Sequence, residues 1–254
     1  MVVAVGAIIF SGNQLFKIKK EENESKTVNK EVIEIIGSES EKKDKKESII
    51  DNNEVDFLTK EAYSKLKDIN SDFVGYLYYP SLEINEQVVQ TTNNSYYLNH
   101  DFYKDYSVYG TVFVEESQNL IEQNTTLYGH WVSNSSLKFS NLHKLKKQED
   151  YDKYKTFYYA DEEFIYEYEV GIVIYHHTVE DFDSIPYWQG SFNEEQLKSF
   201  IDNAKSQAFY DTGVEFNGDD KIMTLQTCIT YDSDERLVIV GKEVKRQAID
   251  WQKP

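Results

Sequence analysis

The stretch TLQTCITYDSDERLVIVG, residues 224–241, contains two apolar alternating runs and the only cysteine of the chain, Cys228. The first run ends at Cys228, and the second begins after Arg236. Alternation with a period of two is typical of half-buried β-strands, so we predict two neighbouring strands joined by the acidic turn at residues 232–235. Such a turn would place a thiol and a guanidinium at the ends of adjacent strands.

Similar short runs recur between residues 73 and 244, separated by Gly, Asn, Asp and Ser. This pattern predicts a mostly β fold, a barrel or sandwich of about eight strands. The predicted strands span residues 73–79, 84–90, 109–115, 125–128, 157–159, 164–175, 222–228 and 237–244. The large share of aromatic residues, with 20 Tyr and 14 Phe, favours the same fold.

Three segments have helical rather than alternating spacing. Residues 55–70 and 137–147 each place apolar side chains on one side of a helix. In the segment at 191–210, Asn193 precedes Gln196 by three residues, the arrangement of a capping box. We therefore predict a helix in the long connection before the strand that ends at Cys228.

The N-terminal part differs from the rest. Residues 1–20 begin with the apolar run MVVAVGAIIF, which is shorter than the roughly 20 residues that span a bilayer, and we interpret them as a partial membrane anchor. Residues 21–54 are rich in Glu and Lys, which predicts a solvated linker with at most a transient helix at 30–36. We expect the folded domain at 55–247 and a tail at 248–254.

Composition excludes several classes of function. A chain of 254 residues, of which 40% are hydrophobic, can bury one sizeable core. The net charge of -18 offers no basic surplus for a phosphate backbone, so we expect no nucleic-acid partner. A single cysteine excludes an internal disulfide.

Chemistry at Cys228 would need a base nearby, because a free thiol with a pKa of about 8.5 is mostly protonated at neutral pH. Histidine is the usual partner, and the chain has five: His100, His130, His143, His176 and His177. His130 stands out because TLYGH places it at the end of an apolar run. From position alone, Cys228 could equally be a small buried hydrophobe, and Arg236 could simply face solvent.

A zinc site built from Cys228 and the histidines lacks the short ligand spacings of known zinc motifs. We expect no metal and no other cofactor. The carboxylates at Glu115, Glu116 and residues 232–235 have the character of solvated turns, and none forms a distinct glycosidase pair.

Three segments together resemble the class B sortases, the cysteine transpeptidases of Gram-positive bacterial surfaces. TLQTC at 224–228, with Arg236 and LVIVG, is similar to the TLxTC motif and downstream arginine of the family. TLYGHWVSNSSLKFSNLHKL at 126–145 is similar to its YGH segment, and residues 69–113 are similar to the class B N-terminal segment.

The resemblance implies a sortase β-barrel with N-terminal helices and a helix after the sixth strand. It implies that Cys228 is the nucleophile, His130 the general acid and base, and Arg236 the group that stabilises the transition state. Thr227 is expected to help position substrate or oxyanion.

The sequence departs from the class at three places. Gln87 replaces the usual proline, Glu115 replaces a common aspartate, and Tyr231 lies one residue further from the cysteine than in many relatives. These departures leave the substrate preference open.

A class B sortase is expected to cleave an NPxTx-like sorting signal at Thr and to transfer the acyl group from Cys228 to a peptidoglycan amine. Its partners would be surface proteins with sorting signals, at the extracytoplasmic face of a Gram-positive membrane to which the N-terminal segment attaches the enzyme. Three alternatives stay open. They are a pilin polymerase with a pilin lysine as acceptor, a catalytically silent module that binds sorting signals, and a cysteine hydrolase.

Overall fold

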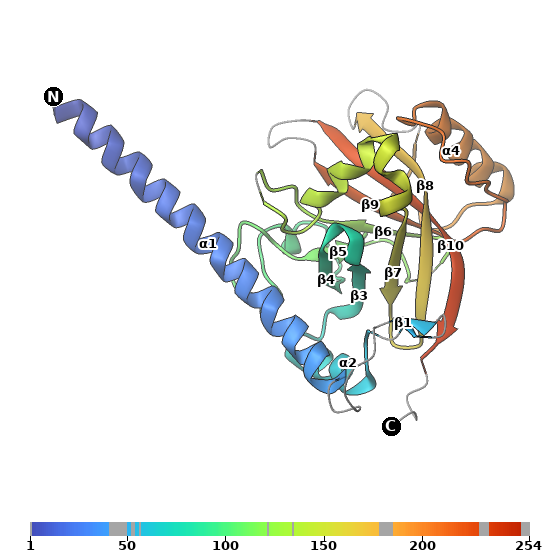
Figure 1. Ribbon diagram of the computed structural model, residues 1–254, viewed down its shortest axis with the longest axis horizontal. Coiled ribbons are helices and arrows are strands. Elements are labelled where there is room, and N and C mark those ends of the chain that lie inside the picture. The colour runs from blue at the N-terminus through green and yellow to red at the C-terminus, as the bar shows by residue number, and fades with distance from the viewer. Residues whose placement is uncertain are drawn as a thin grey trace.

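The computed structural model (Figure 1) describes residues 2–40, 50–51, 54–55, 57–120, 122–133, 135–177, 185–228 and 234–249. Residues 232–233 of the predicted acidic turn and residues 250–254 of the predicted tail therefore lie outside the described residues. The helices and strands are α1 (Val2–Ser40), β1 (Ile50–Asp51), β2 (Glu54–Val55), α2 (Lys60–Ile69), β3 (Phe73–Tyr79), β4 (Ile84–Val89), β5 (Val112–Val114), β6 (Asn124–Tyr128), α3 (Tyr151–Tyr154), β7 (Thr156–Ala160), β8 (Phe164–His177), α4 (Glu194–Ser206), β9 (Ile222–Cys228) and β10 (Glu235–Ala248).

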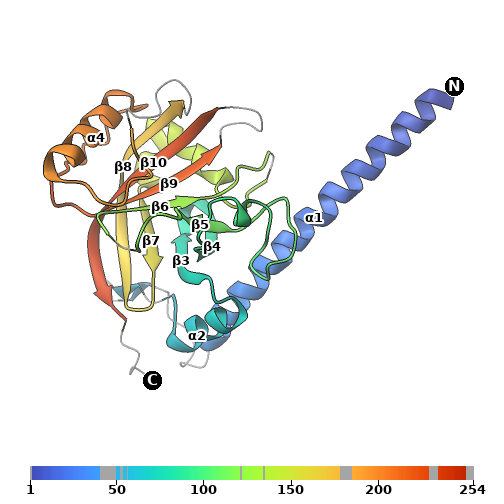
Figure 2. The same cartoon turned by 180° about the vertical axis from the view of Figure 1, so that it is seen from behind.

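Eight of the strands close into a barrel in the order β10-β8-β7-β3-β4-β5-β6-β9 (Figures 1 and 2). Neighbouring strands are antiparallel except for two parallel pairs, β4 with β5 and β6 with β9. The prediction of a mostly β fold with about eight strands is confirmed. The predicted strands at 73–79 and 222–228 coincide with β3 and β9.

Both faces of the sheet around β10 are covered by apolar side chains. Leu237 and Ile239 point into the barrel core, whereas Val238 and Val240 alternate with them and pack on the outer face, and all four are fully buried. The outer layer is supplied by α4 through side chains that share one face of the helix, namely Leu197, Phe200, Ile201 and Ala204. A strand buried on both faces has the near-continuous apolar run LVIV rather than strict alternation.

The start of α4 is fixed by the predicted capping box. The Gln196 N–H donates to Asn193 Oδ1 at 2.8 Å, and the Asn193 N–H donates to Gln196 Oε1 at 2.9 Å. Two of the backbone donors that a helix N-terminus leaves free are satisfied in this way. The helix in the long connection after β8 is thus confirmed.

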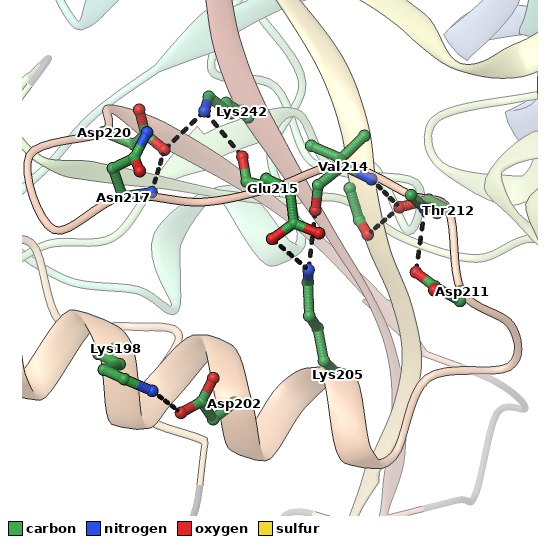
Figure 3. Close-up of polar contacts among 12 residues, drawn as sticks. Lys198, Asp202, Lys205, Asp211, Thr212, Val214, Glu215, Asn217, Asp220 and Lys242 are labelled. Carbon is green, nitrogen blue, oxygen red and sulfur yellow. Dashed lines mark hydrogen bonds and ion pairs between the residues drawn. The ribbon is translucent and has the colours of Figure 1, made fainter.

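Lysine side chains fasten the chain that leaves α4 to the barrel (Figure 3). Lys205 Nζ donates to the Val214 carbonyl at 2.8 Å. Lys242 in β10 donates to the Glu215 carbonyl at 2.8 Å and forms an ion pair with Asp220 at 2.8 Å. These contacts hold the connection between α4 and β9 in one place, so that it forms part of the outer layer.

The predicted helix at residues 137–147 is a 3-10 helix, Ser140–Lys146, rather than an α-helix. Its buried apolar side chains, together with Phe139 just before it, lie three residues apart at Phe139, Leu142 and Leu145. A period of three matches the 3-10 helix, in which residues i and i+3 lie on the same side. These three side chains therefore pack together on the barrel core.

The prediction of a solvated linker from residue 21 is wrong for residues 21–40. The helix α1 continues through them without a break and packs beside α2 and β4 (Figure 1). Ion pairs at i,i+4 spacing, such as Lys26 with Glu22 at 2.6 Å, support the exposed side. Val32 is fully buried on the other side, in a cluster that also includes α2. The composition predicted a linker because this segment has only a few apolar residues, and those few are the ones that pack against the domain.

A buried polar cluster also fixes α1 to the barrel. Asn29 Nδ2 donates to Glu86 in β4 at 2.8 Å, and Glu86 forms an ion pair with Lys138 at 2.9 Å. The side chains of this pair are only 3% and 2% exposed. Gln87, one of the departures from the class B pattern, donates to Asn29 Oδ1 at 3.3 Å. None of the helices in the described part of the chain is both long and apolar enough to cross a membrane.

Candidate functional site

The predicted nucleophile lies at the end of the central strand of three. β9 is hydrogen-bonded to β6 on one side and to β10 on the other. Cys228, half-buried, is the last residue of β9 and is paired with Arg236 in β10. Directly paired residues project from the same face of a sheet, with Cβ atoms about 5 Å apart. The register therefore places Arg236 alongside Cys228.

His130 follows the strand on the opposite side of β9 from β10. β6 and β9 run parallel, and their register continues to the pair Tyr128 and Gln226. The Gly129 N–H then donates to the Gln226 carbonyl at 3.1 Å, so the alignment extends past the strand end. His130 follows Tyr128 by two residues, just as Cys228 follows Gln226, which brings the histidine level with the cysteine. The strand register therefore puts the backbone of His130 on one side of Cys228 and Arg236 on the other.

Cys228 and Arg236 project from the outer face of the barrel, whereas Thr227 does not. Neighbouring residues of a strand point to opposite faces, so Thr227 and Cys228 project in opposite directions. Thr227 is paired with Leu237, whose side chain belongs to the barrel core. Thr227 is fully buried, and its hydroxyl has no hydrogen-bond partner among the described residues.

One hydrogen bond determines the tautomer of His130. Its Nε2 lies 2.7 Å from the Leu98 carbonyl oxygen, which can only accept, so Nε2 carries a proton. In the neutral ring the other nitrogen, Nδ1, is then free to accept a proton. Burial lowers the pKa of His130, the hydrogen bond to Leu98 opposes this effect, and the nearby Lys138 charge adds to it. The neutral imidazole, a competent base, is favoured in the folded protein.

Gly129 allows close packing just before the histidine. A Cβ at this position would lie only 2.7 Å from the ring of Phe139. The Phe139 N–H in turn donates to the His130 carbonyl at 3.0 Å. The requirement for glycine in YGH is therefore steric, and the fully buried Phe139 fixes the backbone that carries the imidazole.

Two side chains near Arg236 were given no role from the sequence, although His176 was one of the five candidate histidines. His176 in β8 is paired with Arg236 on the side away from Cys228, and it is buried. The Tyr187 ring packs edge-on against the His176 ring, with centroids 5.5 Å apart. Burial raises the pKa of Tyr187 to about 12, while the Arg236 charge partly opposes this effect. His176 lies near Arg236 because of strand pairing, and Tyr187 does so because of the path of a loop. Neither position can be read from a local sequence pattern.

Buried polar side chains hold the Tyr187 backbone over the sheet. Asn124 Nδ2 in β6 donates to the Tyr187 carbonyl at 2.7 Å, and the Thr126 hydroxyl donates to the same oxygen. Gln118 Nε2 donates to the next carbonyl, that of Trp188, at 2.8 Å. The segment at Tyr187 and Trp188 is thereby tied to the strand that leads to His130.

Glu115, the second departure from the class B pattern, supports the end of β6. Its carboxylate accepts a hydrogen bond from the Tyr128 hydroxyl at 2.6 Å and another from Asn94 Nδ2 at 2.8 Å. Glu115 is buried. The longer side chain therefore holds the residue two positions before His130, and the sequence reading of Glu115 as a solvated turn residue is wrong.

An open polar cavity of about 630 Å³ lies apart from the three predicted catalytic residues. It is lined by Asp72, Gln90, Thr91, Thr92, Asn93, Tyr96, Glu116 and Gln118. His130, Cys228 and Arg236 do not line it. Within the described ranges, no group of three or more His, Cys, Asp or Glu side chains is arranged to hold a metal ion.

A thiol, a neutral imidazole and a fixed cation are the groups that thiol-dependent acyl transfer requires. The comparisons with known proteins agree with this class. The family model for the sortase domain matches residues 77–244. Sortase B of Listeria monocytogenes is 31% identical over 186 residues, which cover 71% of this chain and 73% of that protein. Sortase B of Staphylococcus aureus is 30% identical over 188 residues, which cover 72% and 75%.

A solved structure of Clostridium perfringens sortase B has a TM-score of 0.65 at 28% identity, and the match covers 72% of this chain and 99% of that one. The chain belongs to the sortase family, whose members are cysteine transpeptidases. Sortases typically act outside the cytoplasm of Gram-positive bacteria.

Proposed function

We propose that this chain is a class B sortase that cleaves an NPxTx-like sorting signal after Thr and joins the surface protein to a peptidoglycan amine. The observation that supports the proposal is the strand register, in which Cys228 is paired with Arg236 and His130 comes two residues after the last paired residue of β6. The names of the two relatives at 30% and 31% identity support the same class. The signal and the acceptor are inferred from that class.

In the first half-reaction, the Cys228 sulfur attacks the carbonyl carbon of the signal threonine after Nδ1 of His130 has taken the thiol proton. Arg236 stabilises the negative charge that develops on the carbonyl oxygen. The C–N bond then breaks, His130 returns its proton to the departing amine, and a thioester remains on Cys228.

In the second half-reaction, an acceptor amine attacks the thioester carbon. His130 takes the amine proton, the C–S bond breaks, and the sulfur recovers a proton. The product is a new amide bond, and the enzyme is regenerated. The N-terminal segment would keep the domain at the outer face of the membrane, where both substrates are present.

The three proposed catalytic residues have more structural support than Thr227 has. Cys228 and Arg236 are paired on adjacent strands and His130 follows the strand on the other side of β9, which supports our retaining all three as catalytic residues. The predicted role of Thr227 in substrate positioning has no support from its buried side chain. We retain the limits 55–247 for the catalytic domain. Helix α1 lies outside these limits but packs against the domain.

The test uses the full chain, a panel of peptides containing NPxTx variants, and three acceptor conditions: a glycine-type amine, a peptide with a lysine side chain, and water alone. Mass spectrometry of the products identifies the bond that is formed. We expect an amide to the glycine-type amine and no product with Cys228→Ala. A lysine isopeptide would indicate a pilin polymerase, and free acid in every condition would indicate a hydrolase. No cleavage across the panel would contradict the proposed function.

A further inference from the structure

A second histidine contacts the nucleophile from the side of its backbone. Nε2 of His143, in the 3-10 helix Ser140–Lys146, lies 3.2 Å from the carbonyl oxygen of Cys228. The oxygen can only accept, so the imidazole N–H donates to it. The two residues are 85 positions apart in the chain.

The position of His143 is fixed by its neighbours. Leu142 and Leu145 on the same turn are fully buried in the barrel core. The ring of His143 also packs against Trp131, with centroids 5.9 Å apart. The buried leucines hold the backbone of His143, and the contact with Trp131 holds its ring, so the donor nitrogen has a fixed position.

The chain from Gly129 to His143 thus contacts the end of β9 at two points, the Gln226 carbonyl and the Cys228 carbonyl. At its start, the backbone before His130 extends the ladder between β6 and β9. At its end, His143 binds the carbonyl of the last residue of β9. Because the peptide of a strand-terminal residue has fewer ladder bonds to hold it, a side-chain donor there restricts the orientation of the whole residue.

His143 acts in this arrangement as a neutral donor. Burial lowers its pKa, the hydrogen bond to Cys228 opposes that effect, and the Lys146 charge adds to it. The single ring proton is on Nε2, so the nitrogen that contacts Cys228 is a donor and not a base.

We propose that His143 is a positioning residue that fixes the Cys228 peptide and so keeps the thiol in line with His130 and Arg236. This inference rests on the proposed function of Cys228. It concerns the orientation of the nucleophile and not the identity of the substrate, so the two can be tested separately.

The test compares His143→Leu, which removes the donor, with His143→Gln, whose side-chain amide can donate from nearly the same place. Lys144→Gln, an exposed neighbour on the same turn, is the matched control. Two quantities are measured on the full chain: kcat and KM for transpeptidation, and the rate of Cys228 alkylation by a small neutral electrophile. The alkylation rate needs no sorting signal, so it remains informative if the proposed substrate is wrong. Thermal unfolding verifies that each variant is folded.

We expect His143→Leu to lower kcat about tenfold, the loss of one hydrogen bond worth about 1.4 kcal/mol, with KM within twofold of the native value. The alkylation rate should fall severalfold in the same variant. His143→Gln should recover most of both losses, and Lys144→Gln should show neither. Native values in folded His143→Leu, equal losses in the Leu and Gln variants, or a loss of kcat with an unchanged alkylation rate would overturn the inference.

Discussion

The site and the docked end of α1 are built in different ways. Cys228 and Arg236 are aligned by strand pairing, and the chain just before His130 is joined to β9 by backbone hydrogen bonds, which do not depend on the identity of the side chains. The segment of α1 around Asn29 is held instead by a few side chains, including a buried ion pair between Glu86 and Lys138. Substitutions should therefore remove chemistry at the site with little loss of stability, and should remove stability around Asn29.

The largest expected effect on stability is at the ion pair. Lys138→Met leaves the Glu86 carboxylate buried without its cation, which should lower the free energy of unfolding by about 3–5 kcal/mol. Denaturant unfolding measures this effect. The control is Lys198→Met, which breaks the exposed pair with Asp202 (Figure 3) and should cost less than about 1 kcal/mol. Equal losses in the two variants would show that burial of the pair is not what holds this region.

At the site, the corresponding change is Arg236→Lys, which keeps a positive charge but loses the planar fork of donors. We expect kcat to fall about 10²-fold, with the free energy of unfolding within about 1 kcal/mol of the native value. Arg246→Lys on the same strand is the control, because Arg246 binds Glu243 through two N–H groups at 2.9 Å. Transpeptidation kinetics of both variants decide the matter, and native kcat in Arg236→Lys would exclude the guanidinium from the reaction.

Acid should weaken the fold through the two histidines next to Cys228. Burial lowers the pKa of His130 and of His143 below the ordinary value of 6.5, so the unfolded chain binds more protons just below pH 6.5. Their contribution to stability is complete above pH 6.5 and is lost as the pH falls from there towards the folded-state pKa values. Denaturant unfolding between pH 8 and 5.5 should show this decline.

The comparison for this decline is the double variant His130→Gln/His143→Gln, in which the titrating groups are absent. Its stability should fall less over the same pH range. Parallel curves for the native and the double variant would mean that other groups cause the decline.

The smallest expected effect is at Thr227. Thr227→Val replaces a buried hydroxyl that lacks a hydrogen bond by a methyl group of similar size, so stability should stay equal or rise by about 1 kcal/mol. We expect kcat to stay within twofold. Unfolding and kinetics of this variant also test the expectation from the family resemblance, since a clear loss of kcat at native stability would restore a role in positioning substrate.

The strands and α4 could be predicted because their signals are local. The alternating run TLQTC and the apolar run LVIVG indicated the two strands, and Asn193 with Gln196 indicated the start of α4. Local alternation also contained the information that Thr227 and Cys228 face opposite sides of β9.

Other features depend on contacts between distant parts of the chain. The parallel pairing of β6 with β9 joins segments about a hundred residues apart, and only the family resemblance linked His130 to Cys228. The partner of His143 is a backbone carbonyl, which no sequence pattern marks. The docking of α1 through Asn29 depends on an ion pair formed by two other segments, and composition alone therefore suggested a linker.

The central claim is that Cys228 is acylated with His130 as its base. Single-turnover acylation of the full chain by a sorting-signal peptide, without an acceptor amine, can be followed by intact mass and mapped to one residue. The account predicts one adduct, located on Cys228, and an acylation rate in His130→Gln that is lower by at least about 10²-fold. An adduct elsewhere, or a native rate in His130→Gln, would contradict it.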